Sequence, residues 1–405
     1  MKSCCCPRLV LAGFLLLANA VAIAASPPAA SSAIPISSHG ILAPMGAYFY
    51  KDHFNNASPL LWAILQDRLQ TAKELIREGS NATALYRGVY PYLGIAAGLH
   101  PCNPEMLDFL MSHGADPKGK MINHAFPNGD AFYFHLVPLM AAASSGSIAC
   151  VSTLLRHGAN PNDFNKQGVT VLGAAAASEY CSPELIAQLI KGGADPNFVP
   201  GPGDLPKSVY QAESKWFGDV SDRERRRLFL SLTMFNRRPP LVLAASYDHP
   251  ACAHALITDG AKVNKAAAHG QTSLMAAVGD GKSAAATALL LHAGANVHAR
   301  TEKGATALFM VAGKYTMGPP CLRCAKLLIK AGADVNAVDH SGNSVLIGAA
   351  GAKDALPFVR MLVSSGADVN YRNPKTDVTA LKAAREAGAV PVEDYLKAHG
   401  ESQLK

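Results

Sequence analysis

A short phrase that recurs along the chain constrains its fold more than any other feature. The phrase is Gly-Ala-Asp/Asn-x-Asn or a close variant, and its copies begin at Gly114, Gly158, Gly193, Gly260, Gly294, Gly332 and Gly366. Divergent copies stand at Gly79 and Gly400. Most copies follow the previous one by 34 or 35 residues, and longer steps mark insertions. A fixed period of this size predicts a stack of repeated supersecondary units.

Each period contains the same succession of local signals. A Thr or Ser precedes a Leu and then an Ala, as in Thr170, Leu172 and Ala175, and a short Ala-rich helix is expected there. A second helix follows a loop, for example at residues 324–330, where apolar residues three and four apart predict one buried stripe. The Gly of the phrase is expected to end this helix with positive φ. A further Gly, such as Gly168, predicts a tight turn before the next Thr.

This pattern resembles the ankyrin repeat over about residues 55–400. The resemblance implies an all-α solenoid of about nine helix-turn-helix units with short β-hairpin fingers. We expect the units at residues 55–86, 87–125, 134–166, 167–198, 236–268, 269–302, 303–340, 341–376 and 377–400. Such a stack presents a concave face of fingers and first helices, and the family implies protein binding without catalysis or a cofactor.

One departure from the family concerns the His of its T-P-L-H phrase. Other residues stand at that position in this chain, namely Leu61, Met140, Gly173, Val242, Met275, Phe309, Ile347 and Lys382. The hydrogen bond of that His is therefore lost, and we expect cohesion between units to depend on apolar packing.

The N-terminus has the pattern of a secretory signal peptide, which we place at residues 1–24. Lys2 and Arg8 precede an apolar run and then small residues, and the run is short for a membrane span. Residues 25–54 begin with a Ser/Pro/Ala-rich stretch and are read as a flexible segment. We therefore expect an exported protein, in the periplasm or secreted. Its formal charge of +7 becomes +5 when Lys2 and Arg8 leave with the leader, which is too mild to predict nucleic-acid binding.

Six cysteines follow the signal peptide, and their positions in the repeat suggest pairs. Cys150, Cys252 and Cys324 each lie eight residues before the phrase Gly, while Cys102 and Cys181 lie twelve before it. We hypothesise disulfides Cys102–Cys150, Cys181–Cys252 and Cys321–Cys324. The alternative for the first two pairs is that each cysteine is a small buried apolar residue. For the C-x-x-C pair, a structural disulfide is favoured over redox chemistry, because no βαβ context surrounds it.

Insertion 118–136 lengthens the connection between the second and third units. Apolar residues alternate on both sides of Asn128-Gly129, a strong β-hairpin signal. The pattern predicts a two-stranded finger whose aromatic residues Phe126, Phe132, Tyr133 and Phe134 either contact a partner or pack back on neighbouring units.

The largest interruption spans residues 199–238, between the repeats at 55–198 and those at 239–400, which a short tail at 401–405 follows. Trp216 precedes a predicted helix whose first turns carry Arg225, Arg226 and Arg227. Cations near a helix start oppose the helix dipole, so a docking role toward an acidic protein surface or anionic lipid is one interpretation. The other is a solvated basic face on a helix that fills a gap in the solenoid.

These observations predict a monomeric, non-catalytic scaffold that binds a protein partner outside the cytoplasm. Neither a G-x-S-x-G nor an H-E-x-x-H motif occurs, and we expect no metal and no cofactor. Contact with a membrane surface is an open alternative that we do not expect. Two alternative functions remain: a secreted effector that binds proteins of another cell, and an envelope enzyme with its site in residues 199–238.

Overall fold

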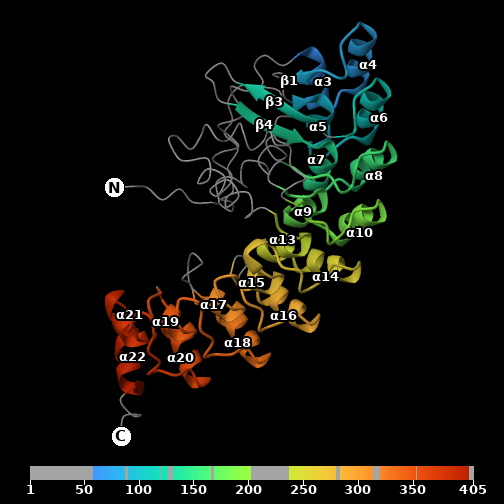
Figure 1. The fold of residues 1–405 in the computed structure, drawn as a ribbon. Helices are drawn as coiled ribbons and strands as arrows, with labels where there is room; N and C mark the ends of the chain where they lie inside the picture. The colour runs from blue at the N-terminus through green and yellow to red at the C-terminus, as the bar shows by residue number, and fades with distance from the viewer. Residues whose placement is uncertain are drawn as a thin grey trace, which may run out of the picture. The chain divides into compact units, whose positions relative to one another are not determined.

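The computed structural model describes residues 58–86, 90–118, 120–125, 131–165, 168–201, 237–279, 283–312, 320–352 and 354–400. For residues 86, 90, 120–125 and 131–136 it describes the backbone alone. The chain divides into two compact units, Met1–Arg237 and Arg238–Lys405 (Figure 1). The predicted signal peptide, the flexible segment up to residue 54 and the tail lie outside the described residues.

The first unit contains four consecutive helix pairs among its described residues. They are α3 (Pro59–Leu65) with α4 (Leu69–Arg77), α5 (Tyr92–Ala97) with α6 (Pro104–Ser112), α7 (Pro138–Ser144) with α8 (Ile148–Arg156), and α9 (Val171–Ala177) with α10 (Pro183–Lys191). The first helices contact one another in order, and so do the second helices, which gives two layers (Figure 1).

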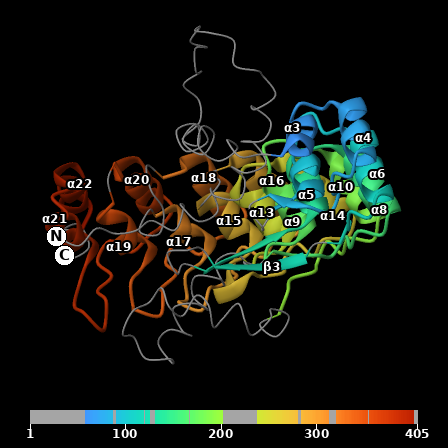
Figure 2. The ribbon, with the colours of Figure 1, turned by 90° about the horizontal axis from the view of Figure 1, so that it is seen from above.

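The second unit repeats this arrangement with five pairs among its described residues. They are α13 (Pro240–Ser246) with α14 (Pro250–Thr258), α15 (Ser273–Gly279) with α16 (Ala284–His292), α17 (Ala307–Val311) with α18 (Leu322–Lys330), α19 (Val345–Ala350) with α20 (Leu356–Ser364), and α21 (Ala380–Glu386) with α22 (Val390–Gly400). Figure 2 separates its two layers, with α17 and α19 on one side and α18 and α20 on the other.

Two short antiparallel sheets lie between helix pairs of the first unit. Strand β1 (Leu85–Tyr86) pairs with β2 (Tyr90–Pro91), and β3 (Lys120–Ala125) pairs with β4 (Ala131–Leu136). In the longer pair Ile122 is opposite Phe134 and Ala125 is opposite Ala131, with the connecting residues 126–130 outside the described part. In the second unit the corresponding connections contain isolated bridges, Val338 with Ser344 and Arg372 with Thr379, and a 3₁₀ turn, η2 (Ala268–Gly270).

The helices begin and end at the residues that the repeat supplies for this purpose. The side chains of Ser58, Thr170, Ser344 and Thr379 each accept a hydrogen bond from a backbone N–H in the first turn of a first helix. Such a cap stabilises a helix by about 1 kcal/mol. The phrase glycines take positive φ as predicted, for example Gly332 at 87°. The helix predicted at residues 324–330 begins two residues earlier, at Leu322.

The core consists of the facing sides of the helices in each pair. At the position of the family's missing His, Leu61, Val242 and Met275 are fully buried, as the expectation of apolar packing requires. Lys382 is the exception, because it is exposed on α21. Each helix pair buries its apolar residues against the neighbouring pairs, which is how a solenoid is stabilised.

Polar contacts between neighbouring pairs supplement this apolar packing. Asn336 donates to the Gly366 carbonyl at 3.0 Å and accepts from the Asp368 N–H at 2.8 Å. Asn162 and Asn264 make the same two contacts with the next phrase along the chain. These contacts between neighbouring repeats were not expected from the sequence, and they add to the apolar packing that was.

Ion pairs tie the last helix to its partner. The Glu393 carboxylate on α22 lies 2.9 Å from Lys397 Nζ and 3.0 Å from Arg385 Nε of α21. The hydrogen bonds from Lys397 and then Arg385 hold the pKa of Glu393 below its usual value. This carboxylate therefore links α21 and α22 most strongly when it is ionised.

Candidate functional site

The predicted partner-binding residues fall mostly outside the described residues. This holds for Phe126, Trp216, Arg225, Arg226 and Arg227. Phe132, Tyr133 and Phe134 lie in β4, where the structure gives the backbone pairing with β3 and not the side chains. Their role in binding therefore stays a prediction, and a candidate surface must be built from other residues.

The turns that precede the first helices of the second unit form a continuous row, which we call the finger row. It consists of residues 269–270, 300–304, 338–342 and 371–377. In the first three turns a Gly adopts positive φ, as Gly304 does at 78° and Gly342 at 85°, and in the fourth turn Asp377 does so at 58°. A Cβ at Gly304 would come within 2.6 Å of the His340 ring, so the glycine also permits the close approach of the next turn.

Hydrogen bonds join each turn of the finger row to the next. The N–H of Glu302 donates to the His269 carbonyl at 2.9 Å, and the two side chains form an ion pair at 2.8 Å when His269 is protonated. The N–H of His340 donates to the Lys303 carbonyl at 2.9 Å. Lys375 Nζ in turn donates to the His340 carbonyl at 2.6 Å. The row is thus one connected surface and not a set of independent loops.

Two further side chains strengthen these connections. Arg300 Nη1 donates to the carbonyls of Gly304, at 3.0 Å, and Val338, at 2.8 Å. Asn373 is buried, and its amide nitrogen donates to the Ser341 carbonyl at 3.1 Å. Because both donors reach backbone carbonyls of a neighbouring turn, they hold the turns at a fixed spacing.

The exposed charges of the finger row are predominantly positive. Four cations and two anions are exposed, namely Arg300, Lys303, Arg372, Lys375, Glu302 and Asp377. Arg372 and Asp377 form an ion pair at 2.6 Å, and this contact lowers the pKa of the Asp377 carboxyl. The four exposed cations exceed the two exposed anions, so these side chains carry an excess of positive charge. Such a surface suits an acidic partner.

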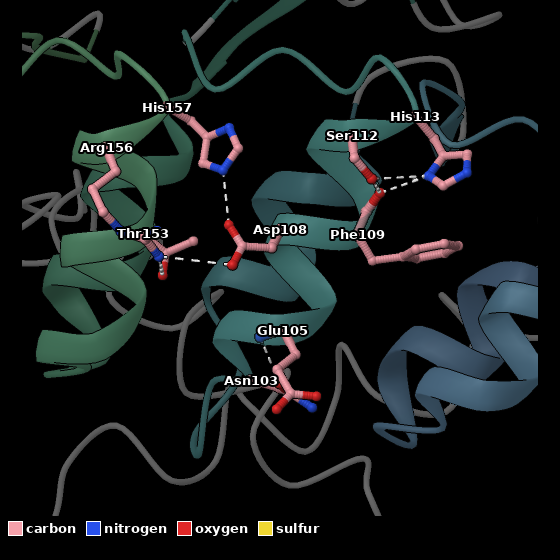
Figure 3. A network of polar contacts seen from close by, with 9 residues as sticks. All are labelled: Asn103, Glu105, Asp108, Phe109, Ser112, His113, Thr153, Arg156 and His157. Carbon is pink, nitrogen blue, oxygen red and sulfur yellow. Dashed lines mark hydrogen bonds and ion pairs between the residues drawn. The ribbon is translucent and has the colours of Figure 1, made fainter.

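A second polar network joins α6 and α8 on the outer layer of the first unit (Figure 3). Asp108 of α6 accepts a hydrogen bond from His157 Nε2 at 2.7 Å, and Arg156 Nη2 lies 3.7 Å from its second carboxylate oxygen. Arg156 also donates to the buried Thr153 hydroxyl at 3.0 Å. These contacts link neighbouring helix pairs near the C-terminus of α8, where a cation interacts favourably with the helix dipole.

Three successive loops of the first unit also meet through polar and ring contacts. His100 stacks on Tyr180 with ring centroids 4.4 Å apart, and its Nδ1 lies 2.9 Å from the Ser145 carbonyl. Burial, followed by the charge of Glu179, raises the pKa of the Tyr180 phenol. The raised pKa favours the neutral phenol, and the contacts of His100 and Tyr180 join three successive loops.

The predicted cysteine pairs have different outcomes. The sulfur atoms of Cys102 and Cys150 lie 1.99 Å apart, and those of Cys321 and Cys324 lie 2.00 Å apart, which is bonding distance in both cases. Cys181 and Cys252 belong to different units, and the disulfide predicted between them stays a prediction. Cysteines at bonding distance are compatible with an oxidising location.

The arrangement of helix pairs, positive-φ glycines and connected turns is that of one repeat family. The family model for ankyrin repeats, built on three copies, matches residues 93–199 and 274–373, which together are just over half of the chain. The chain belongs to the ankyrin-repeat family. Ankyrin repeats generally bind proteins and are generally non-catalytic, so the family accords with the finger row as a docking surface.

A metal site and a membrane-spanning helix each require particular features of the described residues. Within the described ranges no group of three or more His, Cys, Asp or Glu residues is placed to hold a metal ion. Nor does any helix among the described residues have the length and apolar character needed to cross a bilayer.

The fingers were expected from the sequence as part of a concave binding face, but the charged residues and the contacts between turns of the finger row were not, although a signal for them existed. Gly270, Gly304 and Gly342 recur in phase, and charged residues cluster beside them. Glu302 and His269 are 33 residues apart, close to one repeat period, so their contact follows once successive turns are known to stack.

Proposed function

We propose that this ankyrin-repeat protein is a non-catalytic scaffold that binds an acidic protein partner through its finger turns and first helices. The observation that carries the proposal is the finger row, where exposed cations stand on turns held together by backbone hydrogen bonds. A surface fixed before binding loses little conformational entropy when a partner docks, and unbalanced charges of one sign select a partner of the other.

The proposal includes the finer features expected from the sequence. Each of the nine described helix pairs is one ankyrin unit, and the β3–β4 pair is an enlarged finger. The repeats occupy residues 55–198 and 239–400, with the 199–238 insertion between them. We also propose the aromatic residues of the 118–136 finger and the arginines at 225–227 as partner-binding residues of the first unit.

We further propose that the protein acts as a monomer outside the cytoplasm, in the periplasm or after secretion. The signal-like N-terminus and the cysteines at bonding distance support this location. Fractionation of the producing cells tests it. Recovery of the mature chain in the periplasm or the medium is the expected result, and recovery of the uncleaved chain in the cytoplasm would contradict it.

The binding experiment is affinity capture with the tagged mature protein, from envelope extract and culture medium, followed by a titration of the captured partner. The test variant carries Lys303→Glu and Lys375→Glu on the finger row. Its matched control carries Lys326→Glu and Lys330→Glu, which are exposed on α18 in the outer layer.

We expect the finger-row variant to bind about five-fold more weakly for each contact worth about 1 kcal/mol, and the control to bind like wild type. The loss should shrink as salt is raised, because the interaction is electrostatic. Equal affinity of both variants and the wild type would place the docking surface elsewhere.

A further inference from the structure

The C-x-x-C disulfide of the second unit differs from the other described disulfide in how its two sulfurs are placed. Cys321 is the N-cap residue of α18 and is half-buried, whereas Cys324 lies in the first turn and is completely buried. The N–H of Cys324 donates to Cys321 Sγ at 3.2 Å. A nucleophile arriving from solvent therefore has access to one sulfur of the pair, that of Cys321.

An open pocket of about 700 Å³ lies in front of this disulfide. Its lining includes Cys321, Arg323, Asp248, Pro250, Ser283 and Pro320. The pocket thus offers a cation, an anion, a hydroxyl and apolar ring surface next to the accessible sulfur. Its volume is in the range that small peptides and drug-sized molecules occupy in proteins.

The Cys102–Cys150 disulfide has none of these properties. Cys102 is 9% exposed and Cys150 is 0% exposed, so both cysteines are buried between α6 and α8. The bond also joins residues 48 apart, against 3 for Cys321–Cys324. Reduction of the long-range bond releases a long loop, whereas reduction of the short-range bond leaves its cysteines adjacent on one helix.

We propose that Cys321–Cys324 is a thiol-exchange site, at which an incoming thiolate in the pocket attacks Cys321 Sγ. A bond forms between the incoming sulfur and Cys321 Sγ, the Cys321–Cys324 bond breaks, and its electron pair leaves on Cys324 as a thiolate. A second thiolate of the same class then attacks the incoming sulfur of the mixed disulfide. This step releases Cys321 as a thiolate and the two incoming thiols as their disulfide.

The helix geometry favours the second step, in which Cys321 leaves as a thiolate. The N–H of Cys324 and the positive end of the nine-residue helix α18 face Cys321 Sγ, so negative charge released on that sulfur is stabilised. Burial of Cys324 directs attack to Cys321 and keeps the leaving sulfur close enough to re-form the bond. The substrate class is a thiol, either a small one such as glutathione or a cysteine of another protein.

The first experiment uses the oxidised, full-length mature protein. It is incubated with glutathione in one arm and with a reduced, unfolded protein carrying one thiol in the other, and then alkylated and mapped by mass spectrometry. We expect Cys321–Cys324 to react at least about tenfold faster than Cys102–Cys150, because only the former exposes a sulfur. The adduct should be on Cys321.

The two arms identify the source of the thiol. Reaction with glutathione alone would assign a small thiol, and reaction with the protein thiol would assign a protein partner. If neither thiol reacts faster at Cys321–Cys324 than at Cys102–Cys150, or if the adduct is on Cys324, the proposal is wrong.

A pair of variants provides the second measurement, with glutathione disulfide as the probe. Cys324→Ser leaves the accessible Cys321 as a single thiol and should form a mixed disulfide with release of one glutathione. Cys321→Ser leaves the buried Cys324 and should react about tenfold more slowly. Equal rates for the two variants would overturn the proposed geometry, and the wild-type mapping decides the question if either variant fails to fold.

Discussion

Removal of the Cys102–Cys150 disulfide is the perturbation whose effect follows most directly from the structure. The bond fixes the start of α6 to the first turn of α8 across a sequence separation of 48 residues, which includes the β3–β4 pair. In the chain-entropy description, a cross-link over a loop of this length destabilises the unfolded chain by about 4 kcal/mol. The Cys102→Ala/Cys150→Ala variant should lose about that much free energy of unfolding.

The matched control is Cys321→Ala/Cys324→Ala. Its cysteines are 3 residues apart, and the same relation gives about 2 kcal/mol. Both pairs are replaced by the same residue, and one cysteine in each pair is fully buried, so the packing loss is similar. The difference of about 2 kcal/mol between the variants therefore reports loop length.

The assay is urea unfolding of the oxidised proteins, followed by circular dichroism, with hydrogen exchange to locate the effect. Stability in a repeat protein is approximately a sum of contributions from each repeat and its neighbours. The loss of protection of backbone amides against hydrogen exchange should therefore be concentrated in α5–α8. If the two variants are equally destabilised, or if the long-range variant is destabilised by less than about 1 kcal/mol, the reasoning from loop length is refuted.

Three further perturbations test other features. Asn336→Ala removes two hydrogen bonds between neighbouring pairs and should lower the free energy of unfolding by about 1–2 kcal/mol in urea titrations, whereas Asn81→Ala, which loses two exposed hydrogen bonds to Thr83 in its own loop, should change it less. Gly304→Ala should destabilise by about 1–3 kcal/mol more than Gly366→Ala in thermal unfolding, because both glycines have positive φ but a Cβ at Gly366 meets open space. The pKa of Glu393 is lowered in the folded state, so its contribution is present above the pKa of the unfolded carboxyl and is lost as the pH falls through the folded value. Glu393→Gln should therefore flatten the acid side of the stability–pH curve, and an unchanged curve would contradict this assignment.

The repeat architecture could be predicted from the sequence because each local signal has one conformational meaning. Gly332 is followed by Ala and Asp in the phrase, and it adopts the positive φ that ends a helix, as predicted. Several of the periodic Ser and Thr residues cap first helices, whereas Thr306 stands at the same place before α17 and makes no cap hydrogen bond. These features depend on contacts within a few residues, which the sequence displays directly.

Contacts between neighbouring repeats were harder to predict from the sequence. Asn162, Asn264 and Asn336 occupy the same place in the phrase, yet nothing local indicates that their side chains reach the next copy and not their own loop. For Cys102 and Cys150, the positions of cysteines in the repeat suggested a disulfide, but the sequence alone left open the alternative that both are small buried apolar residues. The network around Asp108 lacks such a marker, since surface carboxylates are common on helices.

The connected finger turns have a consequence for how a partner is recognised. Because Arg300, His340 and Lys375 each bond the backbone of an adjacent turn, displacement of one turn is transmitted to the next. The exposed cations stand on two of these turns, Arg300 and Lys303 on one and Arg372 and Lys375 on another, so the distance between the two clusters is set by the repeats that separate them. A partner whose acidic groups have the same separation engages both clusters at once, and one with a different spacing engages a single cluster. Deletion or insertion of a whole repeat between the two clusters would change the distance between them and leave each turn intact. The set of partners that bind would then change with the number of repeats.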